Sequence, residues 1–171
     1  MEPDEFLAQL YACPTYQDQQ NLLHHSLKDL HQQDIATVAD GLKEQVIKLL
    51  WSDTHAALQL SDLLLDLAEH TKDKSHLALG LRTKAQAVML GKGEFQPALD
   101  LYDQAIEIYQ TLGDQVGIAD VNVTRIWALA NLGFYDQAVE DAQKAAQVLQ
   151  QYAQWRALAT LHNNLATIHN R

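Results

Sequence analysis

The chain contains few of the residues that interrupt or cross-link secondary structure. Its 171 residues include one cysteine, three prolines and seven glycines. A single cysteine excludes an internal disulfide, so a reducing compartment, the cytoplasm, is the expected location. The scarcity of proline and glycine leaves long stretches rich in Ala, Leu and Gln, which favour helix, and no stretch alternates apolar and polar residues as a strand would. The sequence therefore predicts an all-α fold.

Basic residues and long apolar runs are scarce as well. There are 12 Lys and Arg against 22 Asp and Glu, a net charge of −10, and the lysines are spread along the chain. Such a field repels phosphate backbones and anionic lipid. No apolar run reaches the ~18 residues of a membrane span, and the first residues (MEPDE) are acidic where a signal peptide would be basic. We expect neither a nucleic-acid nor a membrane partner.

Motifs for metal or catalytic chemistry are also missing. Among the eight histidines, His24 and His25 are adjacent and so diverge on a helix, while His162 and His169 lie two turns apart. Cys13 lies at a predicted helix end without the base and orienting group that a nucleophile needs. No glycine-rich phosphate loop is present. We expect no catalytic residue, no metal site and no cofactor in this chain.

The chain does contain an internal repeat. Residues 93–98 (GEFQPA) and 133–138 (GFYDQA) share the pattern Gly-x-aromatic-x-x-Ala, and a further alanine, Ala105 or Ala145, follows each after seven residues. Self-similarity at a fixed period indicates a helical hairpin that stacks on copies of itself. The alanine stripes should let neighbouring helices approach closely, with Phe95 and Tyr135 filling the space at the hairpin turns.

Alignment outward from this match divides the chain. Residues 57–60 match 98–101 at a spacing of 41, and we place the extra residue in the turn at 91–93. Asp53, Asp73 and Asp114 are predicted N-caps, and the corner at Ala153, which lacks a glycine, is expected to be tighter or more helical. The predicted segments are an N-terminal helical cap at 1–34 and an array at 35–171, comprising repeats at 35–73, 74–113 and 114–153 and an incomplete one at 154–171. The predicted helices of the array are 36–50, 54–71, 75–90, 95–112, 116–132, 135–151 and 154–170.

The pattern resembles the tetratricopeptide repeat (TPR) in its 40-residue variety. Residues 106–117 (IEIYQTLGDQVG), Ala119, the set around Gly133 and residues 162–168 (HNNLATI) carry the resemblance. It implies a right-handed α-α superhelix, a TPR solenoid, that binds proteins. The layout is similar to the N-terminal part of long bacterial TPR proteins, some of which end in a caspase-like CHAT domain.

The last segment resembles the first helix of a repeat whose second helix is missing. We expect either that this helix caps the array or, as the logic of capping favours, that the chain is the N-terminal fragment of a longer protein. An apolar stripe is then expected to lack a partner, and this exposed face could support end-to-end self-association. The stripe comprises Leu158, Leu161, Leu165 and Ile168.

The resemblance also implies a concave binding groove formed by the first helix of each repeat. Trp127 is the strongest candidate there, because an indole offers a large contact area and one donor; the alternative is that it packs between helices. Asparagines of a carboxylate clamp are missing, and Arg82 and Arg125 remain as candidate acid contacts, although such arginines are more often solvated or packed. The predicted lining is Arg82, Gln86, Met89, Val123, Trp127, Ala130, Asn131, Asn163, Thr167 and Asn170.

The sequence thus predicts a protein- or peptide-binding TPR scaffold without catalysis of its own. The partner would be a separate protein or peptide, or another domain of the same protein. The alternative is a regulatory or oligomerisation arm of a larger enzyme or transcription regulator, for example a CHAT protease-like protein.

Overall fold

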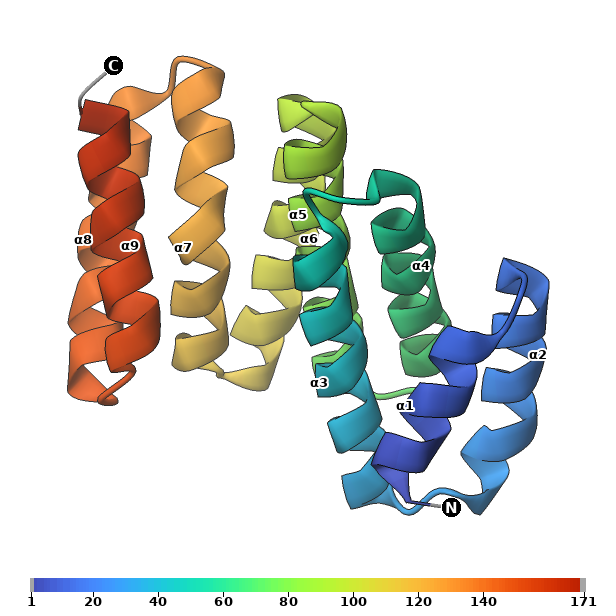
Figure 1. Ribbon diagram of the computed structural model, residues 1–171. Coiled ribbons are helices and arrows are strands. Elements are labelled where there is room, and N and C mark those ends of the chain that lie inside the picture. The colour runs from blue at the N-terminus through green and yellow to red at the C-terminus, as the bar shows by residue number, and fades with distance from the viewer. Residues whose placement is uncertain (1, 170–171) are drawn as a thin grey trace.

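The computed structural model describes residues 2–169, and this part of the chain consists of helices without a strand (Figure 1). The prediction of an all-α fold is confirmed. A 3₁₀ turn, η1 (Leu27–Asp29), follows the second helix, and a π-helical turn, η2 (Val88–Lys92), ends the fifth. The α-helices are α1 (Pro3–Ala12), α2 (Tyr16–Ser26), α3 (Gln32–Leu49), α4 (Thr54–Thr71), α5 (Lys74–Ala87), α6 (Phe95–Leu112), α7 (Gln115–Asn131), α8 (Tyr135–Gln151) and α9 (Trp155–His169).

Consecutive helices are antiparallel and pack as neighbouring pairs, α3 with α4, α5 with α6 and α7 with α8. α1 and α2 lie at one end of the row, where α1 contacts α3 and α2 contacts α4, and α9 lies at the other end. The observed helices match those predicted for the array closely, although α3 begins four residues earlier than expected. Within residues 2–169, no helix combines the length and hydropathy that crossing a bilayer requires.

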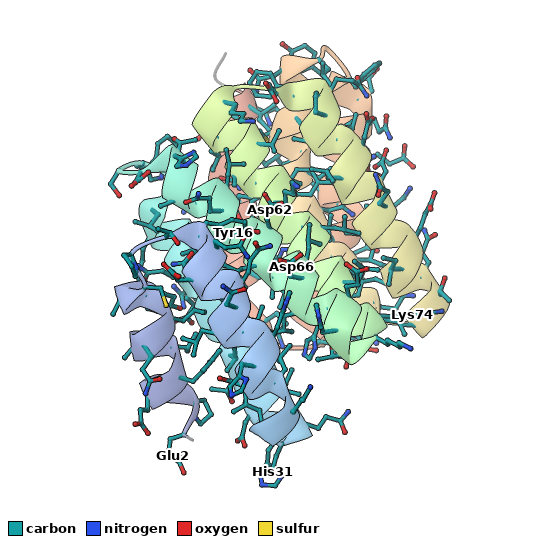
Figure 2. All side chains as sticks on the ribbon, turned by 90° about the vertical axis from the view of Figure 1, so that its right-hand side faces the viewer. Glu2, Tyr16, His31, Asp62, Asp66 and Lys74 are labelled. Atoms are coloured by element: carbon teal, nitrogen blue, oxygen red, sulfur yellow. The ribbon has the colours of Figure 1, made fainter. Side chains whose placement is uncertain are left out.

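The N-terminal helices are fixed to the array by polar as well as apolar contacts. Phe6 and Leu10 of α1 and Leu23 of α2 are fully buried against residues of α3 and α4. The Gln20 amide donates to the Asp66 carboxylate (2.8 Å), which joins α2 to α4. Tyr16 lies beside Asp66 (Figure 2), and burial, together with this carboxylate and its neighbour Asp62, raises the pKa of the Tyr16 phenol to about 12.

The small residues of the repeat lie in the core, as predicted. Ala98, Ala105, Ala138 and Ala145 are all buried, which lets the helices of adjacent pairs approach. The prediction for the turn aromatics is only half right. Phe95 packs against the core, but the Tyr135 ring is 54% exposed. The aromatic side chain therefore fills the space at the turn before α6, but not at the equivalent turn before α8.

The helix α9 is not the unpartnered element that the sequence predicts. Leu161 is 1% exposed and Ile168 is buried, while Leu158 and Leu165 pack partly against the same core. The reason is that α9 contacts both α7 and α8, so its apolar stripe is covered within the chain. The expectation that this stripe lacks a partner is wrong.

The extra residue of the second repeat lies in the turn where the alignment places it. The Glu94 N–H reaches back six residues to the Val88 carbonyl (3.4 Å), whereas the Phe134 N–H, 40 residues later, reaches back five to Leu129 (2.8 Å). A π-helical turn accommodates one additional residue within a helix. η2 thus absorbs the insertion without shifting α6 out of register.

The predicted caps are confirmed. The Asp53 carboxylate accepts from Ala56 N–H (3.0 Å), that of Asp73 from Ser75 N–H (2.7 Å), and that of Asp114 from Gly117 N–H (2.8 Å). Such bonds satisfy backbone donors that the first turn of a helix leaves unpaired.

The corner at Ala153 differs from the prediction. Ala153 adopts the left-handed conformation (φ 55°) that Gly113 adopts at the corresponding corner (φ 70°). Both corners close with the same backbone bond, from Gln154 N–H to Leu149 O (2.8 Å) and from Asp114 N–H to Tyr109 O (2.9 Å). The closing bond and the packing of α8 and α9 therefore impose this backbone even where alanine disfavours it.

Replacing Ala153 with glycine should raise the free energy of unfolding by about 0.5 kcal/mol. Left-handed backbone costs alanine about 1 kcal/mol, and the greater freedom of glycine in the unfolded chain offsets part of that gain. Urea unfolding followed by circular dichroism measures the change. Gly113→Ala, the reverse exchange at the corresponding corner, should destabilise, and two changes of the same sign would contradict the explanation.

Candidate functional site

Two adjoining cavities lie on the face formed by the odd-numbered helices α3, α5, α7 and α9. The first, of about 530 Å³, is lined by Trp51, Gln86, Met89, Leu90, Gly93, Phe95, Thr124, Trp127, Asn131, Thr160 and Asn164. The second, of about 630 Å³, is lined by Lys43, Glu44, Ile47, Lys48, Arg82, Gln86, Asp120, Val123, Thr124, Gln154, Arg156, Ala157 and Thr160. Gln86, Thr124 and Thr160 line both cavities. We call the residues that line either cavity the odd-helix groove.

Several of the residues predicted from the sequence line this groove. Gln86, Trp127 and Asn131 border the first cavity, and Arg82 borders the second. Met89 borders the first cavity but is only 2% exposed, so its side chain belongs mainly to the core beneath.

Four other predicted residues are either buried or line neither cavity. Val123 lines the second cavity but is also buried, and Ala130 is buried and lines neither. Asn163 and Thr167 are exposed on α9 and line neither cavity. Asn170 falls outside the described residues.

On α9, the residue next to the predicted Asn163 is the one that borders the first cavity. Asn164, not Asn163, faces α7, where its side-chain amide donates to the Val123 carbonyl (2.7 Å). Neighbouring positions on an α-helix differ by about 100° in direction, so a one-residue shift moves a side chain off the contact face. The Thr167 hydroxyl instead donates to the Asn163 carbonyl (2.9 Å) of its own helix.

Sequence reasoning also missed the contribution of the first hairpin. Trp51, in the turn after α3, is 79% exposed at the edge of the first cavity. Lys43, Glu44 and Lys48 of α3 line the second cavity. The weak match of this hairpin to the repeat pattern gave no alignment for α3. The signal that the sequence did offer was a tryptophan in the turn between the predicted helices 36–50 and 54–71.

Trp127 fits both of the interpretations offered for it. Its ring is half-buried and packs against the core, and it also borders the first cavity. The Asn131 side-chain amide donates to the Trp127 carbonyl (2.8 Å) one turn earlier, which places these two side chains along one edge of the cavity.

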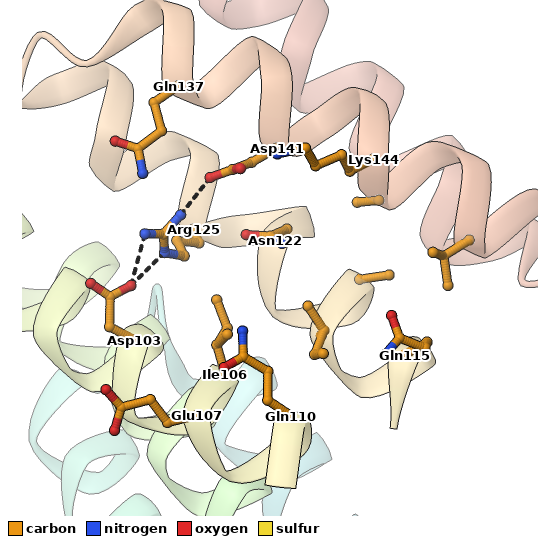
Figure 3. A pocket seen from close by; sticks show the side chains of 14 residues that line it. Asp103, Ile106, Glu107, Gln110, Gln115, Asn122, Arg125, Gln137, Asp141 and Lys144 are labelled. Atoms are coloured by element: carbon orange, nitrogen blue, oxygen red, sulfur yellow. Dashed lines mark hydrogen bonds and ion pairs between the residues drawn. The ribbon is translucent and has the colours of Figure 1, made fainter. Parts of the chain in front are cut away.

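The two arginines proposed as acid contacts occupy different environments. Arg82 donates to the Asp120 carboxylate (3.1 Å) and links α5 to α7 inside the groove. Arg125 is 7% exposed and lies outside the groove, between Asp103 of α6 and Asp141 of α8 (Figure 3). Both of its contacts measure 2.8 Å. Arg125 is therefore an internal link between helices and not a contact for a ligand in the groove.

The histidines form one pair that the sequence did not indicate. The rings of His24 in α2 and His70 in α4 lie with their centroids 4.0 Å apart. Among the described residues, no three His, Cys, Asp or Glu side chains are placed so that they could hold a metal ion.

The fold and the groove are the observations from which a function can be argued. Helical hairpins packed in series place four helices around two adjoining cavities, which are lined by aromatic and charged side chains. The chain matches no protein-family model, and no curated protein matches it.

Proposed function

We propose that this chain is a right-handed α-solenoid of the tetratricopeptide kind that binds a protein segment in the odd-helix groove and performs no catalysis itself. The observation that carries the proposal is that the two cavities of this groove adjoin. They share Gln86, Thr124 and Thr160 and draw their lining from α3, α5, α7 and α9. Every hairpin of the array, together with the final helix, thus contributes to one binding surface.

The size and lining of the groove suit a peptide. Cavities of about 530 and 630 Å³ fall in the range of small-ligand sites. Two adjoining cavities of this size accept several consecutive side chains of an extended segment or one face of a helix. The polar side chains at the junction can bond a peptide backbone. The segment would come from a separate protein or from another part of the same polypeptide.

The exposed Trp51 provides the clearest test. Peptides selected from a random library on the purified chain should bind the Trp51→Ala variant about tenfold more weakly, because a buried aromatic contact typically dominates such an interface. Isothermal titration calorimetry gives both dissociation constants. Trp51 is preferable to Trp127 for this test, since Trp127 also packs against the core and its loss would perturb folding.

The matched control is Trp155→Ala, because this exposed tryptophan lies outside both cavities. It should leave the affinity of the selected peptides unchanged. If no peptide is enriched, or if both tryptophan variants bind the peptides equally well, the groove is not the binding site.

A further inference from the structure

The two halves of the odd-helix groove have different chemistry. The first cavity is bordered by aromatic and aliphatic side chains, chiefly Trp51, Phe95, Leu90 and Trp127. The second is bordered by four basic residues, Lys43, Lys48, Arg82 and Arg156, and by two acidic ones, Glu44 and Asp120. An apolar compartment therefore adjoins a charged one, with the shared polar residues between them.

The basic lining stands out against the composition of the chain. Four of the 12 Lys and Arg residues line the second cavity, but only two of the 22 Asp and Glu do. The lining thus carries four positive and two negative charges, a balance of +2, in a protein of net charge −10. For comparison, the cavity around Arg125 is lined by two basic and three acidic residues.

Two of the four basic side chains are available to a ligand. Lys43 pairs with Asp40 (2.7 Å) and Arg82 pairs with Asp120 (3.1 Å). Lys48 and Arg156 are exposed and form no ion pair with any of the described residues. Lys48 comes from α3 and Arg156 from α9, so they approach the cavity from opposite ends of the array.

We propose that the odd-helix groove selects an acidic peptide segment in which an aromatic or large aliphatic side chain lies close to carboxylates. This inference rests on the proposed function and names the chemistry of its ligand. The apolar side chain enters the first cavity, where Trp51 and Trp127 supply contact area. The neighbouring carboxylates lie in the second cavity and receive charge-assisted hydrogen bonds from Lys48 and Arg156.

The charge distribution favours a peptide over a single-stranded nucleic acid, which aromatic and basic side chains can also bind. A nucleic acid extends a regular row of phosphates well beyond the cavity, where the field of a chain with net charge −10 repels it. A short peptide can confine its carboxylates to the basic compartment. The positive balance of the second cavity also disfavours basic segments there.

The first test is the composition of peptides selected on the chain from a random library. Asp and Glu should be enriched within a few positions of an aromatic or large aliphatic residue, and Lys and Arg should be depleted. Replacing the carboxylates of a selected peptide with amides should weaken its binding by about tenfold. Selected peptides that are neutral or basic would overturn the inference.

The second test reverses the two available charges. The double variant Lys48→Glu/Arg156→Glu should bind a selected acidic peptide at least about tenfold more weakly, and raising the NaCl concentration should reduce the difference from wild type. The control is Lys74→Glu/Lys144→Glu, which makes the same charge change at two exposed positions outside the groove. Equal weakening by both double variants would show that net charge alone acts.

The outcomes separate this inference from the proposed function. Peptides that depend on Trp51 but not on Lys48 and Arg156 would retain the groove and overturn the acidic ligand. Peptides that depend on neither would overturn both. An unstructured single-stranded oligonucleotide that binds more tightly than the selected peptides, and is weakened by the Lys48→Glu/Arg156→Glu change, would overturn the assignment of the ligand as a peptide.

Discussion

Replacing Arg125 with alanine should lower the free energy of unfolding by about 3 kcal/mol. Arg125 is 7% exposed, and its guanidinium donates to carboxylates on two other helices, Asp103 of α6 and Asp141 of α8. Removing one partner of a buried ionic cluster leaves the remaining charges without compensation, which typically costs about 3–5 kcal/mol. The lower end applies here because the Asp103 side chain is half exposed and water can solvate it.

Urea unfolding followed by circular dichroism measures this loss, and a second variant identifies its cause. In Arg125→Met the stem of the side chain keeps its apolar packing but the charge is lost, so most of the destabilisation should persist. The control is Lys144→Ala, which removes an exposed ion pair with Glu140 and should leave the unfolding midpoint unchanged. If Arg125→Ala unfolds at the same urea concentration as this control, the cluster does not join the helices energetically.

The corners between helices show where sequence reasoning succeeds and where it does not. Asp53, Asp73 and Asp114 could be recognised as caps because a carboxylate at that position bonds the backbone of its own next turn, which is a local property. The left-handed backbone of Ala153 has no local cause. It follows from the way α8 and α9 pack and from the closing bond at Gln154, so only the structure reveals it.

The same distinction holds for the candidate site. Gln86, Trp127 and Asn131 were found because the second and third repeats align clearly and their helices keep the expected phase. Asn163 corresponds to Val123 at the 40-residue spacing, whereas the structure places the next positions, Thr124 and Asn164, at the first cavity. The repeat pattern therefore fixed the spacing between helices but not which of two adjacent side chains faces the groove. The sequence favours a solvated or packed role for Arg125, and the structure shows it packed. Its partners could not be named in advance, because they lie on α6 and α8 and no local pattern brings them together.

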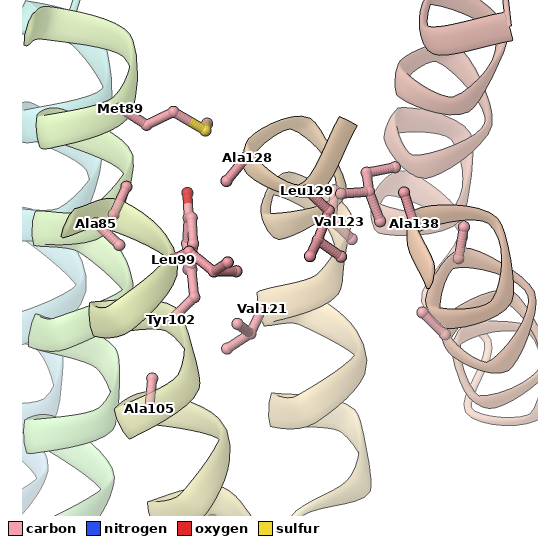
Figure 4. Close-up of a cluster of buried hydrophobic side chains, with 14 of the residues drawn as sticks. Ala85, Met89, Leu99, Tyr102, Ala105, Val121, Val123, Ala128, Leu129 and Ala138 are labelled. Atoms are coloured by element: carbon pink, nitrogen blue, oxygen red, sulfur yellow. The ribbon is translucent and has the colours of Figure 1, made fainter. Parts of the chain in front are cut away.

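Alkaline pH should destabilise the protein through Tyr102, and replacing this residue with phenylalanine should remove that part of the pH dependence. Tyr102 is fully buried among residues that include Met89, Val121 and Ala128 (Figure 4). Burial raises the pKa of its phenol from 10.0 to about 12. Below pH 10 the phenol is neutral in both the folded and unfolded states, so its contribution to stability is fully present.

The contribution is lost as the pH rises from about 10 to 12, because the unfolded chain ionises first. The loss for Tyr102 amounts to about 2 kcal/mol between pH 9 and pH 12. Tyr102→Phe has no group to ionise there. Relative to wild type, the variant should therefore gain about 2 kcal/mol over this interval. At pH 7 the substitution should cost little, since the Tyr102 hydroxyl makes no hydrogen bond of normal geometry among the described residues, and the nearby Thr124 side chain only partly offsets the rise in its pKa.

The measurement is the difference in unfolding free energy between variant and wild type at a series of pH values. Burial also raises the pKa of Tyr11 and Tyr16 to about 12, but both residues are present in the two proteins and their effects cancel in the difference. Tyr135→Phe is the matched control, because its ring is exposed and the same hydroxyl is removed. A difference that stays constant from pH 9 to pH 12 for Tyr102→Phe would contradict the argument. It would mean that water reaches the Tyr102 phenol and that the packing between α6 and α7 is looser than the buried ring implies.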